Sequence, residues 1–454
     1  MAAWSAVRVS EMTPDLRWDA EHYRPEYLRQ AKAFAKLRTM PLGKVATVSD
    51  GNHLSIAEEF SSEGVRYLRG KDLSDFFISD ADPVYIPETS YAALARSHIF
   101  PRDVLVGIVG TIGSVGLVTE RHGKLTGNCK LAIVRASSLP AEYLAVYLAS
   151  RVGQYEIARR TRGAVQMGLI LPDLKELPVV IPDRAVLDRV VSLVVNAQKE
   201  KKQASETIKA AEVRVMKAMG LERLDLEPQK VYARRYSDLE LGNRFGAEYY
   251  MPCKLRVFEA LAKQPHRTVS EHAPSIREIW DPTRATSAER VRNFDVTDAL
   301  EPLLDDSITP QSASDIGSSK KRFQAGDVVI SRLRSYLKQI AVVRTTDTLT
   351  TVGSSEFIVL RPTGNGLSAE ALAVFLRCPL VQTVLKWSQD GSNHPRFAEE
   401  DLLALPVPDS LVRAQKDIEA LVHNAIDARR QAVSLLQRAT KSVEEMISVA
   451  TLHE

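Results

Sequence analysis

The chain contains two copies of one ordered set of segments, and this duplication limits the architectures open to it. Residues 17–29, RWDAEHYRPEYLR, return as RFGAEYYMPCKLR at 244–256, identical at 7 of 13 positions without a gap. Three further segments return in the same order, each 228 residues later: LPAEYLAVYL (139–148) as LSAEALAVFL (367–376), DLKELPV (173–179) as DLLALPV (401–407), and LVVNA (193–197) as LVHNA (421–425). This pattern predicts a tandem duplication, hence a pseudo-dimer on one chain.

Between the repeated segments the two copies diverge, from about residue 40 to 135 and from about 268 to 360. These parts have strand character. In the first copy, residues 65–73 predict a strand leading to a turn, and residues 103–118 predict a strand, a Gly-rich turn and a strand. Similar runs lie at matching places in the second copy, at 291–300 and 327–343. With helical patches at 139–150 and 367–377, each copy is expected to form a mixed α+β domain.

Each copy ends in a long predicted helix. Residues 183–219 and 409–446 contain neither glycine nor proline, and apolar residues recur in both at heptad spacing. The seam positions include Leu187, Val194, Lys201, Ile208, Val422, Arg429 and Leu436. Repeated alanines beside this seam favour packing of the two helices, each ~55 Å long, as an antiparallel coiled coil about a pseudo-twofold. The alternative is that each helix lies on its own domain.

The predicted division follows from these segments: a first domain at 1–182, a spacer helix at 183–220, a second domain at 221–408 and a C-terminal spacer helix at 409–454. Lys201 and Arg429 interrupt the two apolar seams. A buried basic residue needs a partner and can set the register, whereas the alternative is that both side chains extend to solvent.

Composition excludes several classes of protein. The 454 residues are 44% hydrophobic and 26% charged, as expected of a folded, soluble chain, and the formal net charge of +3 requires any nucleic-acid surface to be local. The three cysteines have no zinc-site spacing, and a disulfide framework is not supported. Without a signal-peptide pattern or a run long enough to span a bilayer, a cytoplasmic location is expected.

The familiar catalytic and cofactor motifs do not occur. The glycines of GVRYLRGKD (64–72) are too far apart for a phosphate loop, and GIVGTIGSVG (107–116) lacks the dinucleotide-binding spacing. The sequence also contains neither HExxH nor GxSxG. We therefore predict no catalytic residue, no metal site and no cofactor.

Basic residues give a more specific indication. In SRLRSYLKQ (331–339) four cationic or aromatic side chains alternate, which in a strand places them on one face. Such a face can bind phosphates and guanine edges, although a charge run is more often only a solvated surface. Because candidate runs occur in both copies, we predict DNA contacts at Arg66, Arg69, Lys71, Thr111, Ser114, Arg159, Arg160, Arg162, Gln166, Arg292, Lys320, Lys321, Arg322, Arg332, Arg334, Tyr336, Lys338, Asn393, His394 and Arg396.

Taken together, these segments resemble the specificity (S) subunits of type I restriction-modification systems. The resemblance rests on the two divergent domains, on "LPV" or "LPVVIP" before each alanine-rich helix, and on FPRDVLVGIVGTIGSVGLV and FQAGDVVISRLRSYLKQIAVV. It covers about residues 17–446. The chain departs from the family at the helix entries, IPDRAVLDRV and VPDSLVRAQKDI, where Pro-Pro-Leu and most of the Glu-Gln start are missing.

The resemblance implies two target-recognition domains on a coiled-coil spacer, reading the two halves of a bipartite site in double-stranded DNA. It implies two DNA adenine methyltransferase (modification) subunits as partners, with restriction/translocase subunits as further candidates, and a non-catalytic role in phage defence. The repeated segments at 17–29 and 244–256 would then be scaffold or partner-binding surface. Three alternatives stay open: a DNA-modifying enzyme, a DNA-binding adaptor or regulator of another defence system, and a type IIB-like modification complex.

Overall fold

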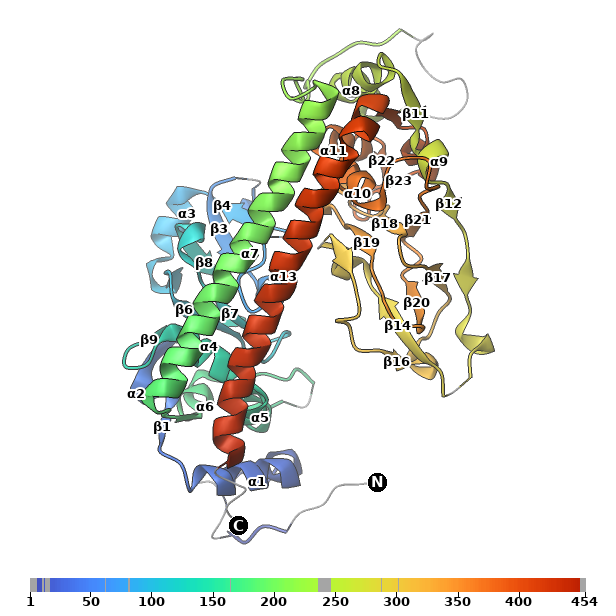
Figure 1. Cartoon of the computed structure of the whole chain (residues 1–454). Helices are drawn as coiled ribbons and strands as arrows, with labels where there is room; N and C mark the ends of the chain where they lie inside the picture. Colours follow the sequence, from blue (N-terminus) through green and yellow to red (C-terminus); the bar gives the residue numbers. More distant parts are fainter. Residues whose placement is uncertain are drawn as a thin grey trace. The chain divides into compact units, whose positions relative to one another are not determined.

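The computed structural model describes residues 6–9, 12, 17–61, 63–80, 82–163, 165–235, 246–286, 288–300 and 302–449 (Figure 1). The chain divides into two compact units. Unit 1 comprises Met1–Lys201 and Arg430–Glu454, and unit 2 comprises Lys202–Arg429. Both long helices therefore belong partly to each unit, whereas the predicted domain bounds assign each helix to a segment of its own.

Unit 1 contains two four-stranded sheets. One has the order β2-β9-β6-β7 and the other the order β4-β3-β8-β5. The strands are β2 (Ala46–Asp50), β3 (Val65–Leu68), β4 (Val84–Ile86), β5 (His98–Ile99), β6 (Asp103–Gly107), β7 (Val115–Leu117), β8 (Leu125–Gly127) and β9 (Leu131–Ala136), and β1 (Thr39–Pro41) pairs separately with β10 (Pro178–Val180). Apart from the long helix α7 (Arg184–Met219), the α-helices that precede unit 2 in the chain are α1 (Pro25–Phe34), α2 (Leu42–Val45), α3 (Glu88–Ala93), α4 (Ala141–Ala149), α5 (Arg151–Arg160) and α6 (Leu171–Lys175).

Strand β6 is buried on both faces, which explains its unbroken apolar sequence. Alternate side chains of a strand point to opposite faces. Val104 and Val106 pack in the larger core with α4 and the long helices, whereas Leu105 packs in the smaller core beside Leu125 of β8. The two sheets of unit 1 thus enclose one core, and the helices enclose the other.

Unit 2 repeats this plan with two five-stranded sheets, in the orders β12-β21-β18-β19-β15 and β13-β17-β20-β14-β16. The strands are β12 (Ser275–Ile276), β13 (Ile279–Trp280), β14 (Arg290–Phe294), β15 (Leu303–Leu304), β16 (Gln311–Ser312), β17 (Lys320–Phe323), β18 (Val328–Ser331), β19 (Ile340–Val343), β20 (Thr350–Gly353) and β21 (Phe357–Leu360). Two small pairs are β11 (His266–Thr268) with β24 (Pro406–Pro408), and β22 (Gln389–Asp390) with β23 (Arg396–Phe397). Apart from the long helix α13 (Asp409–Val449), the α-helices of the second copy are α8 (Pro252–Ala262), α9 (Val269–His272), α10 (Ala369–Arg377), α11 (Pro379–Lys386) and α12 (Glu399–Leu403).

The central strand β18 of unit 2 corresponds to β6. Val328 and Ile330 pack in the helix-covered core, and Val329 packs in the core between the sheets. Strand β18 therefore has a continuous apolar run, as a strand buried on both faces requires. The predicted α+β class and the predicted strand–turn–strand segments are confirmed in both units.

The long helices α7 (Arg184–Met219) and α13 (Asp409–Val449) pack against each other in antiparallel fashion (Figure 1). In unit 1, Val190 and Val194 near the start of α7 share a core with Ala439 and Val443 near the end of α13. In unit 2 the order is reversed, since the late residues of α7 share a core with the early residues of α13. The predicted coiled coil is confirmed, and the alternative of two separate helices is wrong.

The seam residues differ in burial. Val194 and Val422 are buried, whereas the other predicted seam positions, Leu187, Lys201, Ile208, Arg429 and Leu436, are half-buried. Lys201 forms an ion pair with Asp75, and its ammonium lies 5.6 Å from the centre of the Phe77 ring. The basic residue in the first seam is therefore paired with the strand-rich part of its own unit.

The repeated segments that begin the copies adopt the same local structure. In unit 1 the 3-10 helix η2 (Ala20–Tyr23) leads into α1, and in unit 2 η8 (Ala247–Tyr250) leads into α8. Proline is the first residue of each α-helix, where its missing N–H costs nothing and its φ suits a helix. Arg244 and Phe245 lie outside the described residues. Each repeated segment thus leads into the first α-helix of its copy.

Candidate nucleic-acid interface

In unit 1 the Gly-rich turn after β6 lies against a hairpin that follows α5. Arg162 and Gly168 exchange two backbone hydrogen bonds of 2.8 Å, and the Leu169 N–H donates to the Ile108 carbonyl at 2.9 Å. We call the described residues of 108–114 and 162–168 tip 1. The hairpin turns sharply because Gly163 has φ 121°, and a Cβ there would lie 2.2 Å from the Gln166 carbonyl oxygen. Backbone hydrogen bonds thus close the hairpin of tip 1 and connect it to the Gly-rich turn.

The outward side chains of tip 1 are almost uncharged. Thr111 and Gln166 are exposed, and Ser114 is half-buried, with its hydroxyl donating to the Thr111 carbonyl at 2.8 Å. Val165 is fully exposed (102%), which is unusual for a β-branched apolar side chain. Arg162 donates to both carboxylate oxygens of Asp173 at 2.6 and 2.8 Å, so its charge is balanced. Tip 1 therefore presents hydrogen-bonding and apolar groups.

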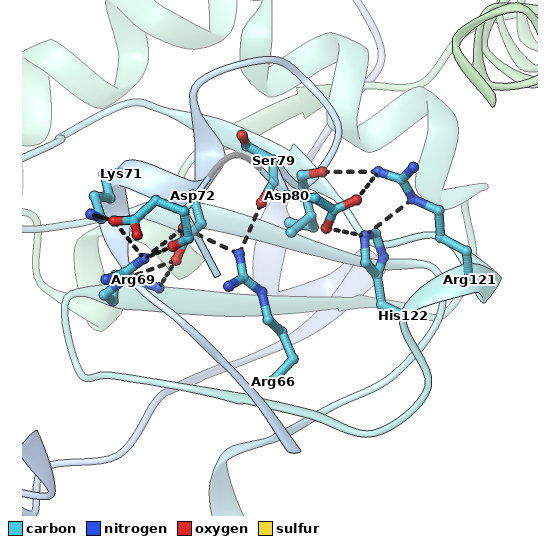
Figure 2. A network of polar contacts seen from close by, with 10 residues as sticks. Arg66, Arg69, Lys71, Asp72, Ser79, Asp80, Arg121 and His122 are labelled. Atoms are coloured by element: carbon cyan, nitrogen blue, oxygen red, sulfur yellow. Dashed lines mark hydrogen bonds and ion pairs between the residues drawn. The ribbon is translucent and has the colours of Figure 1, made fainter. Parts of the chain in front are cut away.

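Figure 2 shows the polar network beside tip 1, where Arg66 and Arg69 both turn toward Asp72. Arg66 on β3 is 5% exposed; it donates to Asp72 at 3.3 Å and to the Ser79 carbonyl at 2.9 Å. Arg69 precedes the 3-10 helix η4 (Gly70–Leu73), and its backbone N–H donates to the same carboxylate at 2.7 Å. Lys71 forms an exposed ion pair with Asp82. These three cations are engaged within the unit.

The network continues to Asp80, which accepts contacts from Arg121 at 2.8 Å and from His122 at 3.5 Å. Burial raises the pKa of Asp80, but the hydrogen bond from His122 and the charge of Arg121 outweigh burial and hold this pKa below its ordinary value. Helix η4 itself touches tip 1, because a Cβ added to Gly70 would lie 2.4 Å from the Thr111 hydroxyl oxygen. The network thus supports the base of tip 1.

Arg159 and Arg160 lie at the end of α5, before the hairpin. The Arg159 guanidinium donates to the His22 carbonyl at 3.0 Å, and burial lowers its pKa. Arg160 forms an ion pair with Glu156. Arg159 thus connects α5 to the N-terminal segment and Arg160 pairs within α5, so the structure does not bring either side chain to the exposed face of tip 1.

Unit 2 has an equivalent arrangement built from a different sequence. The Phe397 N–H donates to the Arg332 carbonyl at 3.2 Å, and the Arg334 N–H donates to the Pro395 carbonyl at 2.9 Å. The turn after β18 therefore lies against the β22–β23 hairpin, as the Gly-rich turn lies against the hairpin of unit 1. We call residues 332–339 and 390–396 tip 2.

The predicted strand face at 331–339 is wrong. Strand β18 ends at Ser331, and residues Ser335–Leu337 form the 3-10 helix η12. Arg334 and Lys338 have φ of 52° and 51°, in the left-handed region that ends any extended strand. The Ser331 N–H donates to the Gln339 carbonyl at 2.9 Å, which closes the turn. The alternating cations therefore occupy a turn, and they point in different directions.

Several predicted residues do meet at tip 2. Glu356 accepts from Arg332 at 3.1 Å and from Arg396 at 2.7 Å. The hydrogen bond from Arg396 holds the pKa of Glu356 below its ordinary value. One carboxylate thus orients two arginines, and the three side chains carry a net charge of +1.

Arg334 adds a further cation to tip 2. Its Nη2 donates to the Asn393 carbonyl at 3.2 Å and contacts His394 Nδ1 at 3.3 Å. Asn393 and His394 are exposed, as is the Tyr336 ring on the same turn (54%). Tip 2 is therefore cationic and aromatic, in contrast to tip 1.

The remaining candidates of unit 2 lie elsewhere. Arg292 on β14 is 2% exposed and donates to both oxygens of Asp347 at 2.8 and 2.6 Å. Lys338 turns toward Glu212 of α7, with 3.4 Å between the charged atoms. Lys320, Lys321 and Arg322 lie on β17, in the sheet that does not contain β18.

Two features of the tips were missed at the level of sequence. Glu356 lies in the short connection between β20 and β21, and its role depends on which arginines the fold brings to it. Val165 and Met167, the latter 49% exposed, lie in a segment where we considered only charged and amide side chains. A search for apolar residues in the loop equivalent to 391–396 would have found them, because 163–168 lies 228 residues earlier.

The described residues provide no cluster of three or more His, Cys, Asp or Glu side chains that could hold a metal ion. No helix within the same ranges has the length and apolar character needed to cross a membrane. Buried Cys378 has its pKa raised to about 12 by burial, so its thiol is not activated.

No family model and no curated protein matches this chain. Among solved structures, the chain is similar to a type I restriction-modification system S subunit from M. genitalium, with 14% identity over 89% of this chain and 95% of that one and a TM-score of 0.39. It is also similar to the HsdS subunit from Thermoanaerobacter tengcongensis, with 14% identity, coverage of 90% and 96% and a TM-score of 0.30. A chain from a structure of the type I R-M system has 13% identity, with coverage of 91% of this chain and 97% of that one and a TM-score of 0.29. Because these TM-scores are low, the proposal of function rests on the two tips and the long helices.

Proposed function

We propose that this chain is the DNA-binding specificity subunit of a type I-like restriction-modification complex. Tip 1 and tip 2 each read one half of a bipartite site in double-stranded DNA. The observation that carries the proposal is that one tip architecture occurs twice. In each copy the turn between two strands is hydrogen-bonded to a hairpin, and the side chains on it differ between the copies. A duplicated frame with divergent tips is what an asymmetric two-part target requires.

The proposed contacts differ from the initial candidates because of burial. Arg66 and Arg292 are buried and ion-paired, and we assign them to stability. The exposed members of the tips and two half-buried arginines, Arg334 and Arg396, remain as proposed DNA contacts; the exposed members are Thr111, Gln166, Arg332, Tyr336, Asn393 and His394. Lys71 and the cations of β17 are proposed phosphate contacts outside the tips, since long-range attraction needs no direct readout.

The chemistry belongs to partner chains in this proposal. Two DNA adenine methyltransferase subunits would bind equivalent surfaces of the two copies, and restriction/translocase subunits would join through them. The duplicated segments, from η2–α1 and η8–α8 to the long helices, provide the paired scaffold for such docking. The four-part division at residues 182, 220 and 408 remains part of this proposal.

Methylome sequencing of the host with and without this gene tests the proposal. We expect a bipartite motif with methylated adenines in the presence of the gene, and its loss on deletion. Expression of the intact chain should restore the motif, whereas the purified chain alone with S-adenosylmethionine should methylate nothing. An unchanged methylome would contradict the proposal and would favour a DNA-binding adaptor, and methylation by the chain alone would favour an enzyme.

A further inference from the structure

The two tips differ in chemistry as well as in sequence. Tip 1 exposes Val165, Gln166 and Met167, and its one cation, Arg162, is neutralised by Asp173. Tip 2 exposes Tyr336, holds Arg332 and Arg396 against the carboxylate of Glu356, and holds Arg334 against Asn393 and His394. Base pairs differ in the same way, because the major groove of an A·T pair presents a methyl group and G·C does not.

On the basis of the proposed function, we infer that tip 1 reads an A·T base pair and that tip 2 reads a guanine. At tip 1 the isopropyl group of Val165 contacts the thymine C5-methyl, and the Gln166 amide pairs with the N6 and N7 edge of adenine. At tip 2 the two N–H groups of Arg334 Nη1 donate to O6 and N7 of guanine. These side-chain and base pairings have matching donors and acceptors.

The geometry of tip 1 supports this assignment. The apolar side chain of Val165 lies fully in water beside exposed Gln166, although valine is a residue type that is usually buried. The two backbone bonds between Arg162 and Gly168 keep the hairpin closed, so the Val165 and Gln166 side chains are presented at fixed places on it. Within the described residues the Gln166 amide makes no hydrogen bond, which leaves both its donor and its acceptor for a base.

The geometry of tip 2 supports the second assignment. Arg334 Nη2 is held by Asn393 and His394, which orients the planar guanidinium. In the described part of the chain no hydrogen bond occupies its Nε or Nη1, so both N–H groups of Nη1 are left to donate. The left-handed backbone of Arg334 (φ 52°) is costly for a side chain of this kind and indicates that its direction matters.

The test combines modified bases with matched variants. Binding-site selection from random duplexes, with the full chain and the subunits that co-purify with it, first identifies the two half-sites. Deoxyuridine then replaces thymine in each half-site in turn, which deletes the C5-methyl alone, and 7-deazaguanine replaces guanine, which deletes N7 alone. Dissociation constants are measured for every pairing of protein and duplex.

For tip 1, one deoxyuridine should weaken wild-type binding about fourfold, as expected for one buried methyl group. Val165→Ala should lose this response, whereas Val231→Ala, at an equally exposed valine (88%), should keep it. Gln166→Ala should relax the preference for adenine in the same half-site.

For tip 2, 7-deazaguanine should weaken wild-type binding about tenfold, the scale of one hydrogen bond from a charged donor. Arg334→Asn should lose this response without added strain, because asparagine tolerates the left-handed region. Arg277→Asn, at an exposed arginine with a surface ion pair, should retain it. A bipartite site that tolerates both modified bases at every position would overturn this inference and leave the proposed function standing. Failure of the wild-type complex to enrich any sequence would overturn both.

Discussion

A buried arginine lies in an equivalent inner strand of each unit. Arg66 lies in Val65–Leu68, and Arg292 lies in the VRNF run of β14. Each guanidinium is paired with aspartate, and each strand lies beside a parallel neighbour, β8 or β20. Removing one partner of a buried ion pair leaves the other charge uncompensated. We therefore expect substitutions at these two arginines to change the stability of the protein.

We predict that Arg292→Met lowers the free energy of unfolding by about 1 kcal/mol, because the two aspartates that lose their partner stay in contact with water. The apolar replacement fills much of the volume but leaves Asp347 and Asp306 without their cation. Urea denaturation monitored by circular dichroism measures the change. Arg284→Met, at a side chain that is 87% exposed, is the matched control and should change stability little. Equal stability of the two variants would rule out the structural role.

The same ion pair predicts a pH dependence. The hydrogen bond from Arg292 lowers the pKa of Asp347 from 3.8 to about 2. A carboxylate with a lowered folded-state pKa stabilises the fold above its unfolded-state pKa, and this contribution is lost as the pH falls from about 4 to about 2. The difference in stability between wild type and Arg292→Met should therefore shrink across this interval. Urea titrations at a series of acidic pH values test this, and a constant difference would contradict it.

At the scale of elements, the sequence predicted the long helices and the paired strands because their apolar periods are unambiguous. It failed at residues 331–339, since the same alternation of cations is compatible with a strand or with a turn that contains two left-handed residues. Unit 1 uses Gly110 and Gly113 at positive φ in the equivalent turn, where unit 2 uses Arg334 and Lys338. The burial of Arg66 and Arg292 was also unpredictable, because their aspartate partners are brought near by tertiary structure.

The packing of α7 on α13 predicts a steric limit at its alanines. Ala439 is completely buried among Val190, Val194 and their neighbours. Ala439→Leu should overpack this seam and destabilise the protein by about 1–3 kcal/mol. Ala420→Leu, at an exposed position of the same helix, should be close to neutral. Thermal and urea unfolding of both variants provide the comparison, and equal stabilities would show that the helices do not pack closely there.

At the scale of the whole molecule, one duplicated frame carries two chemically different tips, and two continuous helices belong to both units. Under the proposed function the frame determines how many bases separate the half-sites, whereas the tips determine which bases are read. These two properties should then change independently. A tip substitution such as Arg332→Ala should cost about 1–3 kcal/mol of binding and alter sequence preference without altering spacing.

Spacing should respond to helix length. Insertion of one heptad after Lys201 in α7 and another after Arg429 in α13 keeps both apolar seams in phase and lengthens each helix by about 10 Å. We expect the unspecified gap of the selected site to widen by about three base pairs, at 3.4 Å per step, with both half-sites unchanged. Replacing exposed Lys202, Gln203 and Glu206 by alanine changes the same segment without lengthening it, so its gap should stay constant. Binding-site selection with both variants measures the gap, and an unaltered gap in the lengthened protein would refute the spacer role because the helices would then not set the separation of the two readers.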